Sequence, residues 1–184
     1  MAIVFIILLA IVIILVAWAI GVYNRLIKLK ILVEEGWSTI DVFLKKRYDL
    51  VPNLVSSVKG YAAHEKETFE SVTRARSMAM GAKDMTSRMN SENALGGVLG
   101  RLMAVAENYP DLKANENFMY LQQELSKLEG ELERVRRYYN GTVREMNIAI
   151  KTFPANIIAN MFRFKDGVFF ESAENDKEVP QVSL

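Results

Sequence analysis

The chain has 184 residues, of which 51% are hydrophobic and 24% are charged, so extensive disorder and low-complexity chains are excluded. It contains no cysteine, which excludes disulfides, thiolate nucleophiles and cysteine-based zinc sites. The 23 Lys and Arg against 22 Asp and Glu leave a net charge of +1, so we do not expect nucleic acid as a partner.

Residues 1–23 are predicted to be a transmembrane anchor, because no charged residue precedes Arg25. The stretch 1–22 is apolar on all sides, and as a helix it would run about 33 Å, enough to cross a hydrocarbon core of about 30 Å. Aromatic and cationic side chains at its end are typical of the membrane interface. The expected interface residues are Trp18, Tyr23, Arg25, Lys28 and Lys30.

The charge pattern also predicts an orientation. No Lys or Arg precedes the apolar stretch and several follow it, so the N-terminus is expected outside and the rest of the chain in the cytoplasm. The alternative is a cleaved signal peptide, but a basic leading region is absent and the apolar run is longer than the core of such a peptide. Ala17 and Gly21 form a small-residue pair that would let two such helices approach closely.

A helical bundle domain is expected over 24–153. Val33, Trp37, Ile40 and Leu44 recur at helical spacing, and no turn signal precedes Val33, so the membrane helix is expected to continue into this first soluble helix. Proline interrupts helical hydrogen bonding, so Pro52 predicts a kink or short break between Tyr48 and Asn53, with Asp49 capping the next turn.

Two further helices are expected before a breaker sequence at 108–111. A looser apolar face continues from Val58 to Ala79 and ends before Gly81, and the stretch 81–93 lacks a period and is predicted to be a loop. A third helix follows, beginning around Leu95 and ending near Glu107. Its small residues Gly96, Gly100 and Ala104 indicate either close helix packing or a mobile helix.

The most regular pattern predicts one long helix, of about 35 residues. Its apolar positions alternate steps of three and four: Phe118, Leu121, Leu125, Leu128, Leu132, Val135, Tyr139, Met146, Ala149 and Phe153. Such a seam forms either a coiled coil between chains or the core face of an antiparallel bundle within one chain, and we favour the second. With no strand signal, the fold class is all-α: an N-terminal transmembrane helix that continues into an antiparallel bundle of long helices.

The C-terminal part changes character at Pro154. Residues 154–171 are predicted to be an amphipathic segment in which Ile157, Ile158 and Phe162 contribute an apolar surface. This surface either packs on the bundle or forms an interface with a partner or the membrane. The polar stretch 172–184 is expected to be a disordered tail.

No catalytic, metal or cofactor site is expected. His64 is the only histidine, and the carboxylates are scattered along helix faces, so we expect neither an enzyme nor a bound cofactor. Asp41 lies four residues from Lys45 and is expected to form a surface pair or a polar register lock, and Arg47 belongs to a basic cluster for partner binding or solvation. Residues expected to serve interaction or structural motifs are Trp37, Asp41, Arg47, Asp49, Asn53, Pro154, Asn156, Ile158 and Phe162.

Several stretches together resemble the LemA family of bacterial membrane proteins. They are EGWSTIDV at 35–42, KKRYDLVPNLV at 45–55, RYYN at 137–140, TFPANIIA at 152–159, FK at 164–165 and FFE at 169–171. Gly36 stands where the family commonly has alanine, and Asn160 and Arg163 stand where it often has glycines. The resemblance implies a single-pass protein of the bacterial plasma (inner) membrane with a short outer N-terminus and a cytoplasmic helical bundle.

The functional hypothesis is a non-catalytic, membrane-anchored scaffold that assembles with further copies of itself. Membrane lipid and a protein partner at the membrane are the other expected partners. The alternative is a regulatory adaptor that binds a membrane protease or sensor protein. Self-assembly predicts that a charge at Ile158 or Phe162 spoils assembly, whereas Leu125 or Leu132 changed to Asp spoils only the bundle.

Overall fold

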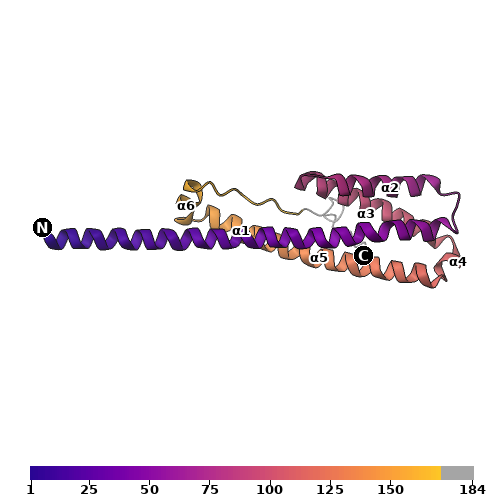
Figure 1. The fold of residues 1–184 in the computed structure, drawn as a ribbon, viewed down its shortest axis with the longest axis horizontal. Helices are drawn as coiled ribbons and strands as arrows, with labels where there is room; N and C mark the ends of the chain where they lie inside the picture. The colour runs from indigo at the N-terminus through magenta and orange to yellow at the C-terminus, as the bar shows by residue number, and fades with distance from the viewer. Residues whose placement is uncertain (171–184) are drawn as a thin grey trace, which may run out of the picture. The chain divides into compact units, whose positions relative to one another are not determined.

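The computed structural model describes residues 1–170, and in this range it contains helices and no strand (Figure 1). The helices are α1 (Ala2–Lys59), α2 (Lys66–Gly81), α3 (Met85–Glu107), α4 (Pro110–Lys113), α5 (Glu116–Lys151) and α6 (Ala155–Met161). The predicted all-α class is confirmed. The tail predicted at 172–184 lies outside the described residues.

The chain divides into two compact units, and the long helices α1 and α5 each contribute to both. The first unit consists of Met1–Thr39 and Val135–Phe169, and the second of Ile40–Arg134 with Phe170 as the last described residue. The boundaries between the two units lie inside α1 and inside α5. The domain boundaries expected from the sequence lie elsewhere, at the end of the apolar stretch and at Pro154.

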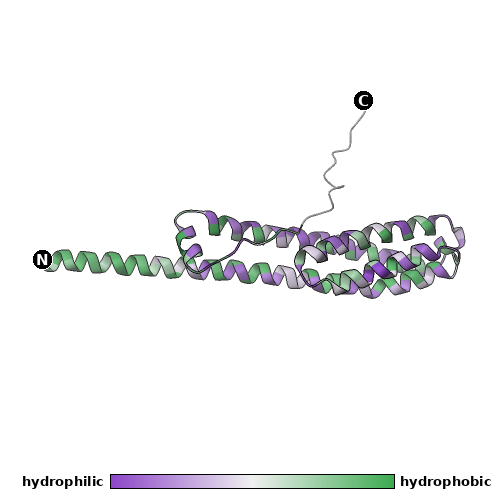
Figure 2. Ribbon diagram, turned by 90° about the horizontal axis from the view of Figure 1, so that it is seen from above, coloured by the Kyte–Doolittle hydropathy of each residue, from purple (hydrophilic) through white to green (hydrophobic). Residues whose placement is uncertain are grey.

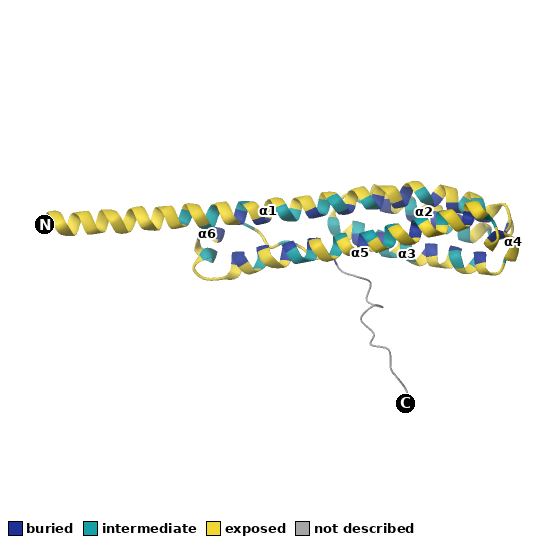
Figure 3. Ribbon diagram, turned by 90° about the horizontal axis from the view of Figure 1, so that it is seen from below, coloured by how far each residue is buried: buried dark blue, intermediate teal, exposed yellow. Residues whose placement is uncertain are grey.

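Within the first unit, α1 begins with its apolar part. Of the helices described, α1 is the one long and apolar enough to cross a membrane, and its most apolar 18 residues have a mean hydropathy of 3.5 with none of them buried. Figure 2 shows this part as an almost uniformly hydrophobic helix, and Figure 3 shows it exposed on all sides. The helix continues to Lys59, which confirms that no turn follows the apolar stretch.

The first unit is completed by the end of α5 and by α6. Gly36 of α1 lies against Tyr139 of α5, whereas Trp18 and Val22 share a cavity with Thr152, so the two helices run antiparallel. The core of this unit contains residues from all three helices: Leu26, Leu29, Met146, Ala149, Ile150 and Ala159. Because each helix contributes one apolar stripe, packing the three together removes all of them from water.

Gly36 provides a first test of this packing. A Cβ atom built there would lie 3.4 Å from Cα and 3.5 Å from Cβ of Tyr139, which is ordinary contact distance. We expect Gly36→Ala to raise the free energy of unfolding by about 0.5 to 1 kcal/mol, because glycine is a poor helix residue. Urea unfolding of the full-length protein in detergent, followed by circular dichroism, measures the difference.

The matched substitution is Gly167→Ala, where the added atom would meet Val143 Cγ1 at 3.1 Å. That contact is tight, so Gly167→Ala should give no gain in stability. A loss of stability for Gly36→Ala would show that α1 and α5 cannot accommodate a methyl group at this crossing.

The second unit is a bundle of four helical segments with alternating directions. Along α1, the partner numbers rise on α3, from Asp41 with Arg88 to Arg47 with Glu92. They fall on α2, from Tyr48 with Arg76 to Val55, which shares a groove with Phe69. They also fall toward the start of α5, from Arg47 with Glu129 to Tyr61 with Asn115. This up-down-up-down arrangement confirms the antiparallel bundle.

The sequence predicted a kink or a short break at Pro52, and the break is wrong, because α1 passes through this residue without interruption. A proline cannot donate a backbone hydrogen bond, so the carbonyl of Tyr48, four residues earlier, loses its helical partner. Arg76 of α2 replaces it by donating from Nε to the Tyr48 carbonyl at 2.7 Å. Asp49 and Asn53 therefore lie in mid-helix with exposed side chains, and Asp49 begins no new turn.

The predicted loop at 81–93 is also wrong. Helix α3 begins at Met85, and the side chain of its N-cap residue Asp84 accepts a hydrogen bond from the Ser87 amide at 2.9 Å. Met89 and Glu92 are buried in the first turns of this helix. Because Glu92 is charged, the buried face does not show a continuous stripe of apolar residues in the sequence. Conversely, the helical face expected to continue past Val58 is interrupted, since α1 ends at Lys59 and α2 starts at Lys66.

The remaining helix predictions are confirmed. Helix α3 ends at Glu107, α5 has 36 residues, and the described end of the chain contains the short helix α6. The predicted seam of α5 is buried or half-buried along its length, with one exception. Phe153 lies beyond the end of α5 and is 75% exposed.

Candidate membrane-interface site

The apolar part of α1 ends among the residues predicted to lie at the membrane surface. Trp18 is 39% exposed, Tyr23 is half-buried, and the cations that follow are exposed. Trp18 and Arg25 line a cavity of about 290 Å³ together with Phe153 and Pro154. The turn between α5 and α6 therefore lies beside the end of the apolar stretch.

Aromatic contacts fasten the end of α6 to α1. The ring centroid of Tyr23 lies 4.7 Å from that of Phe162 and 6.0 Å from that of Phe164, in tilted and edge-on geometries. Such pairs contribute about 0.5 to 1.5 kcal/mol each beyond the area they bury. From the sequence, Tyr23 was expected at the membrane interface, and the surface of Phe162 was left open to the bundle, a partner or the membrane; the structure brings the two side chains together.

Helix α6 places only part of its predicted apolar surface outward. Ile158 is buried within the first unit, so it is a packing residue and not part of an exposed face. Its neighbours Ile157, Met161 and Phe162 are 55%, 63% and 53% exposed. Pro154 precedes the helix, and the buried Oδ1 of Asn156 has no hydrogen-bond partner among the described residues.

The backbone after α6 takes an unusual conformation at Arg163, whose φ is 57°. The Arg163 amide donates to the Asn160 carbonyl at 3.1 Å and the Phe164 amide donates to the Ala159 carbonyl at 2.9 Å, which is the Schellman pattern of a helix end. Glycine usually occupies the left-handed position of this motif, and any other residue there costs about 1 kcal/mol or more. An arginine is held here in a conformation that favours glycine.

Arg163 lines a groove that sequence reasoning did not find. The groove has a volume of about 420 Å³ and combines aromatic, aliphatic and cationic side chains from three segments: Tyr23, Ile27, Lys30, Met146, Phe162, Arg163, Phe164 and Lys165. Lys30 forms an exposed pair with Glu34 at 3.7 Å. Three cations and three aromatic side chains thus line one groove next to the end of the apolar stretch.

The segment after the groove is held along α5 by side-chain to backbone hydrogen bonds. Asn147 Nδ2 donates to the Gly167 carbonyl at 3.0 Å, and the Gly167 amide donates to Asn147 Oδ1 at 2.8 Å. The Tyr139 hydroxyl donates to the Val168 carbonyl at 2.8 Å, and burial raises the pKa of this hydroxyl, which keeps the donor protonated. We call these contacts the Asn147 clamp. They position Phe164 and Lys165 at the groove.

Two predicted motif residues have partners that their spacing did not indicate. Trp37 stacks in a tilted geometry on Tyr139, with 5.8 Å between ring centroids, within the first unit. Asp41 pairs with Arg88 of α3 in the second unit, which corrects the expected pairing with Lys45. Both contacts connect different helices, so local spacing could not have indicated them.

The second unit contains a buried ionic network around Arg47, which corrects the assignment of this residue to a solvated cluster. The Arg47 side chain is 5% exposed and contacts Glu92 at 3.0 Å and Glu129 at 2.8 Å. The Tyr48 hydroxyl donates to the other carboxylate oxygen of Glu92. A Cβ at Gly96 would lie 3.5 Å from Arg47 Nη2, which is ordinary contact distance, so this part of α3 packs directly on the guanidinium, whereas Gly100 faces open space.

Burial raises the pKa of Tyr48 well above its usual value, and its hydrogen bond to the Glu92 carboxylate raises it further. The hydroxyl therefore remains a donor throughout the physiological range. The network has the character of a structural element, since its charges pair with one another in the core.

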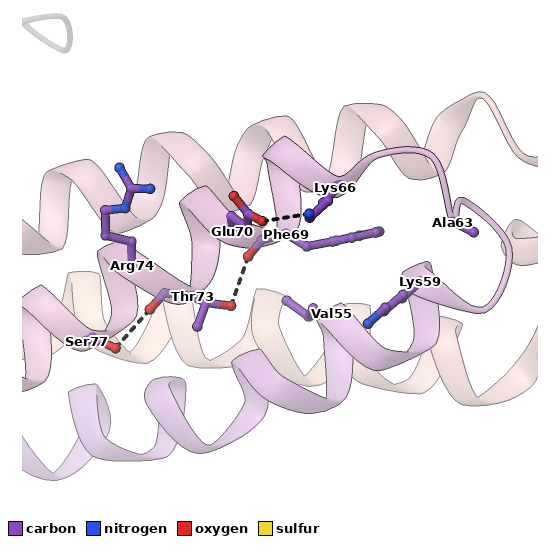
Figure 4. Close-up of a pocket in the computed structure, with 9 residues that line it drawn as sticks. All are labelled: Val55, Lys59, Ala63, Lys66, Phe69, Glu70, Thr73, Arg74 and Ser77. Atoms are coloured by element: carbon purple, nitrogen blue, oxygen red, sulfur yellow. Dashed lines mark hydrogen bonds and ion pairs between the residues drawn. The ribbon is translucent and has the colours of Figure 1, made fainter.

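A second groove lies in this unit between the end of α1 and α2 (Figure 4). Its volume is about 730 Å³, and Phe69 and Val55 lie between the two helices. Lys59, Lys66 and Arg74 surround these apolar residues, and Glu70 pairs with Lys66 at 3.7 Å. The groove is thus mainly apolar inside and basic at its edges.

Within residues 1–170, no group of three or more His, Cys, Asp or Glu side chains is arranged to hold a metal. The described part of the chain is a helical bundle that follows an N-terminal helix suited to membrane anchoring, with a basic and aromatic groove at the end of the apolar stretch. These features define a class of helical-bundle proteins with an N-terminal helix that is long and apolar enough to span a membrane.

The chain belongs to the LemA family, whose model matches residues 36–184. It is 27% identical over 159 residues to "Protein LemA" of Metamycoplasma hominis, with 86% of this chain and 73% of the relative covered. It is 24% identical to "Magnetosome protein MamQ" of Magnetospirillum gryphiswaldense, covering 87% of this chain and 70% of the relative. For "Magnetosome protein MamQ 2" of Paramagnetospirillum magneticum the identity is 23%, with 81% of this chain and 64% of the relative covered.

Proposed function

We propose that this protein is a non-catalytic scaffold, anchored by the apolar part of α1 in the bacterial plasma membrane, that assembles with further copies of itself. The N-terminus lies outside and the bundle in the cytoplasm. The orientation is supported by the charge pattern, in which cations follow the apolar stretch and none precedes it. Three relatives are named for the magnetosome rather than for a reaction, which agrees with a structural role.

The observation that carries self-assembly is the apolar face beside the membrane anchor. Phe153, Ile157 and Met161 are more than half exposed, although Ile158 and Ala159 of α6 are buried in its unit. Exposed apolar side chains that adjoin one another mark interaction surfaces more often than isolated ones do. Gly21 lies within the anchor. A Cβ atom built there would have no other atom within 4 Å, which leaves room for a second helix to approach closely.

The mass of the full-length protein, extracted from its own membrane in native lipid, tests the proposal. A homogeneous multiple of the 20.9 kDa chain mass is the expected result. A single chain that holds a second protein would contradict self-assembly and favour an adaptor. The co-purifying protein would then be identified from the same preparation.

Changing Ile157 to Asp should separate assembly from folding. The side chain is 55% exposed, so the charge costs little in the single chain, but it would be buried between copies. We expect the mass to fall to that of a single chain while the helical circular dichroism is unchanged.

Leu132→Asp is the matched control, because Leu132 is fully buried in the second unit. This change should reduce helicity in the same buffer by placing a charge in the bundle core. If Ile157→Asp keeps the parent mass, the proposed face is not the assembly interface.

One observation favours the adaptor as a second candidate. The groove between α1 and α2 has an apolar interior and basic edges, which suits a short acidic and hydrophobic segment of a membrane protease or sensor protein. Lys59→Glu together with Arg74→Glu should then release a co-purifying partner without changing the mass of a self-assembled form.

A further inference from the structure

The groove beside the membrane anchor has an excess of positive charge. Among the described residues, the ion pairs near it engage Lys30 with Glu34 and Lys151 with Asp166, and neither uses Arg163 or Lys165. Arg163 and Lys165 therefore lack an acidic partner within the described first unit. The third cation of the groove, Lys30, has a partner, but this ion pair is exposed to solvent. An anion would complete this arrangement.

The position of the groove along α1 indicates where that anion comes from. Tyr23 marks the end of the apolar stretch, and Lys30 lies two turns, or about 10 Å, further along the helix. The polar headgroup layer extends about 5 to 8 Å beyond the hydrocarbon core, and a lysine side chain can reach back several ångströms to it. Phospholipid phosphates lie in this layer, within reach of all the groove cations.

The backbone at Arg163 gives an independent indication. The left-handed conformation with φ of 57° would be adopted more easily by glycine, and the Schellman hydrogen bonds of this turn use only backbone atoms. The arginine side chain is therefore not needed to form the turn. The turn does place that side chain at the groove, between Phe162 and Phe164.

We propose that this groove binds the phosphate group of an anionic phospholipid. Lys30, Arg163 and Lys165 contact the phosphate, with the planar guanidinium suited to two parallel hydrogen bonds. The aromatic side chains Tyr23 and Phe162 contact the glycerol and the upper acyl chain, because they line the same groove and pack against each other. Basic pockets beside a membrane helix are a known solution for binding anionic headgroups.

This inference rests on the membrane anchorage in the proposed function and does not depend on self-assembly. A copy that remains a single chain would still present the complete groove, since every lining residue belongs to the first unit. The lipid-binding proposal and the self-assembly proposal can therefore be contradicted independently of each other.

The test is native mass spectrometry of the full-length protein in a non-ionic detergent. The protein is incubated with equal amounts of phosphatidylglycerol and phosphatidylcholine, and the bound lipids are counted. The same spectrum gives the number of subunits, so a failure of the scaffold proposal is read independently of lipid binding. We expect phosphatidylglycerol to be retained preferentially by the parent protein.

The informative variants are Arg163→Gly and Lys165→Gln. Arg163→Gly removes the side chain and suits the left-handed backbone, so its unfolding temperature should be equal to or above that of the parent. Each lost cation should lower phosphatidylglycerol binding about fivefold, and the double variant should lose the preference almost entirely. Arg144→Gln is the matched control, because Arg144 is exposed on α5 and lies about 200° around the helix from the groove residue Met146.

Three results would overturn the proposal. The first is equal phosphatidylglycerol binding by Arg163→Gly, Lys165→Gln and Arg144→Gln. The second is an unfolding temperature that falls in both groove variants, since the side chains would then be structural. The third is complete displacement of bound phosphatidylglycerol by excess inorganic phosphate, which would assign the groove to a soluble phosphate instead of a lipid.

Discussion

Replacing Glu92 with alanine is expected to lower the free energy of unfolding by about 3 to 5 kcal/mol. The Glu92 side chain is fully buried and accepts hydrogen bonds from Arg47 and Tyr48. Without it, the Arg47 guanidinium remains 5% exposed with Glu129 as its remaining carboxylate partner, and the Tyr48 hydroxyl loses its acceptor. Urea unfolding of the full-length protein in detergent, followed by circular dichroism, measures the change.

Two further variants show whether the loss comes from an unpaired buried charge. Glu70→Ala breaks the exposed pair with Lys66 and should cost less than about 1 kcal/mol. The triple variant Arg47→Met, Tyr48→Phe and Glu92→Leu removes the buried charges together and leaves only Glu129, whose side chain is 40% exposed to solvent, so it should be close to neutral. A cost for Glu92→Ala no larger than that for Glu70→Ala would mean that the network contributes nothing to folding.

Replacing Asn147 with leucine should lower the free energy of unfolding by about 2 kcal/mol, because two hydrogen bonds to Gly167 are lost at once. The effect should also be local. Hydrogen exchange at the Gly167 amide should accelerate far more than exchange in α3, since the Asn147 clamp holds only the segment that follows α6.

Asn160→Leu is the matched control for this change. Asn160 is exposed at the end of α6, and its role in the Schellman turn uses its backbone carbonyl. It should leave exchange at Gly167 unchanged. Slow exchange at Gly167 in Asn147→Leu would show that the backbone there is held by other contacts.

The sequence predicted those helices whose buried positions are apolar. Helix α5 was found almost to the residue, because Leu125 and Leu132 belong to a seam of regular steps. The start of α3 was missed because Glu92 occupies a buried position, and a charge there hides the apolar stripe. The break expected at Pro52 fails for a tertiary reason: Arg76, which belongs to the next helix, satisfies the carbonyl that the proline leaves free.

The candidate site was predictable only in part. Tyr23 and Lys30 follow the apolar stretch directly, so composition was enough to place them near its end. Arg163 and Lys165 lie near the other end of the described chain, and only the antiparallel packing of α1, α5 and α6 brings them to the same groove. The Asn147 clamp gave no signal, since one polar residue on a helix is ordinary.

The unbroken course of α1 restricts how the length of this chain can change. Within the second unit, α1 buries Leu44, Val51 and Val58, which recur every seven residues along one face. Inserting a single residue between Leu44 and Val51 would turn every later side chain of α1 by about 100° around the helix axis relative to Leu44, so Val51 and Val58 would leave that face. An insertion of one heptad restores the angle to within about 20°. Lengthening α1 inside the second unit is therefore also a rotation, and only insertions of whole pairs of turns keep its buried stripe in phase.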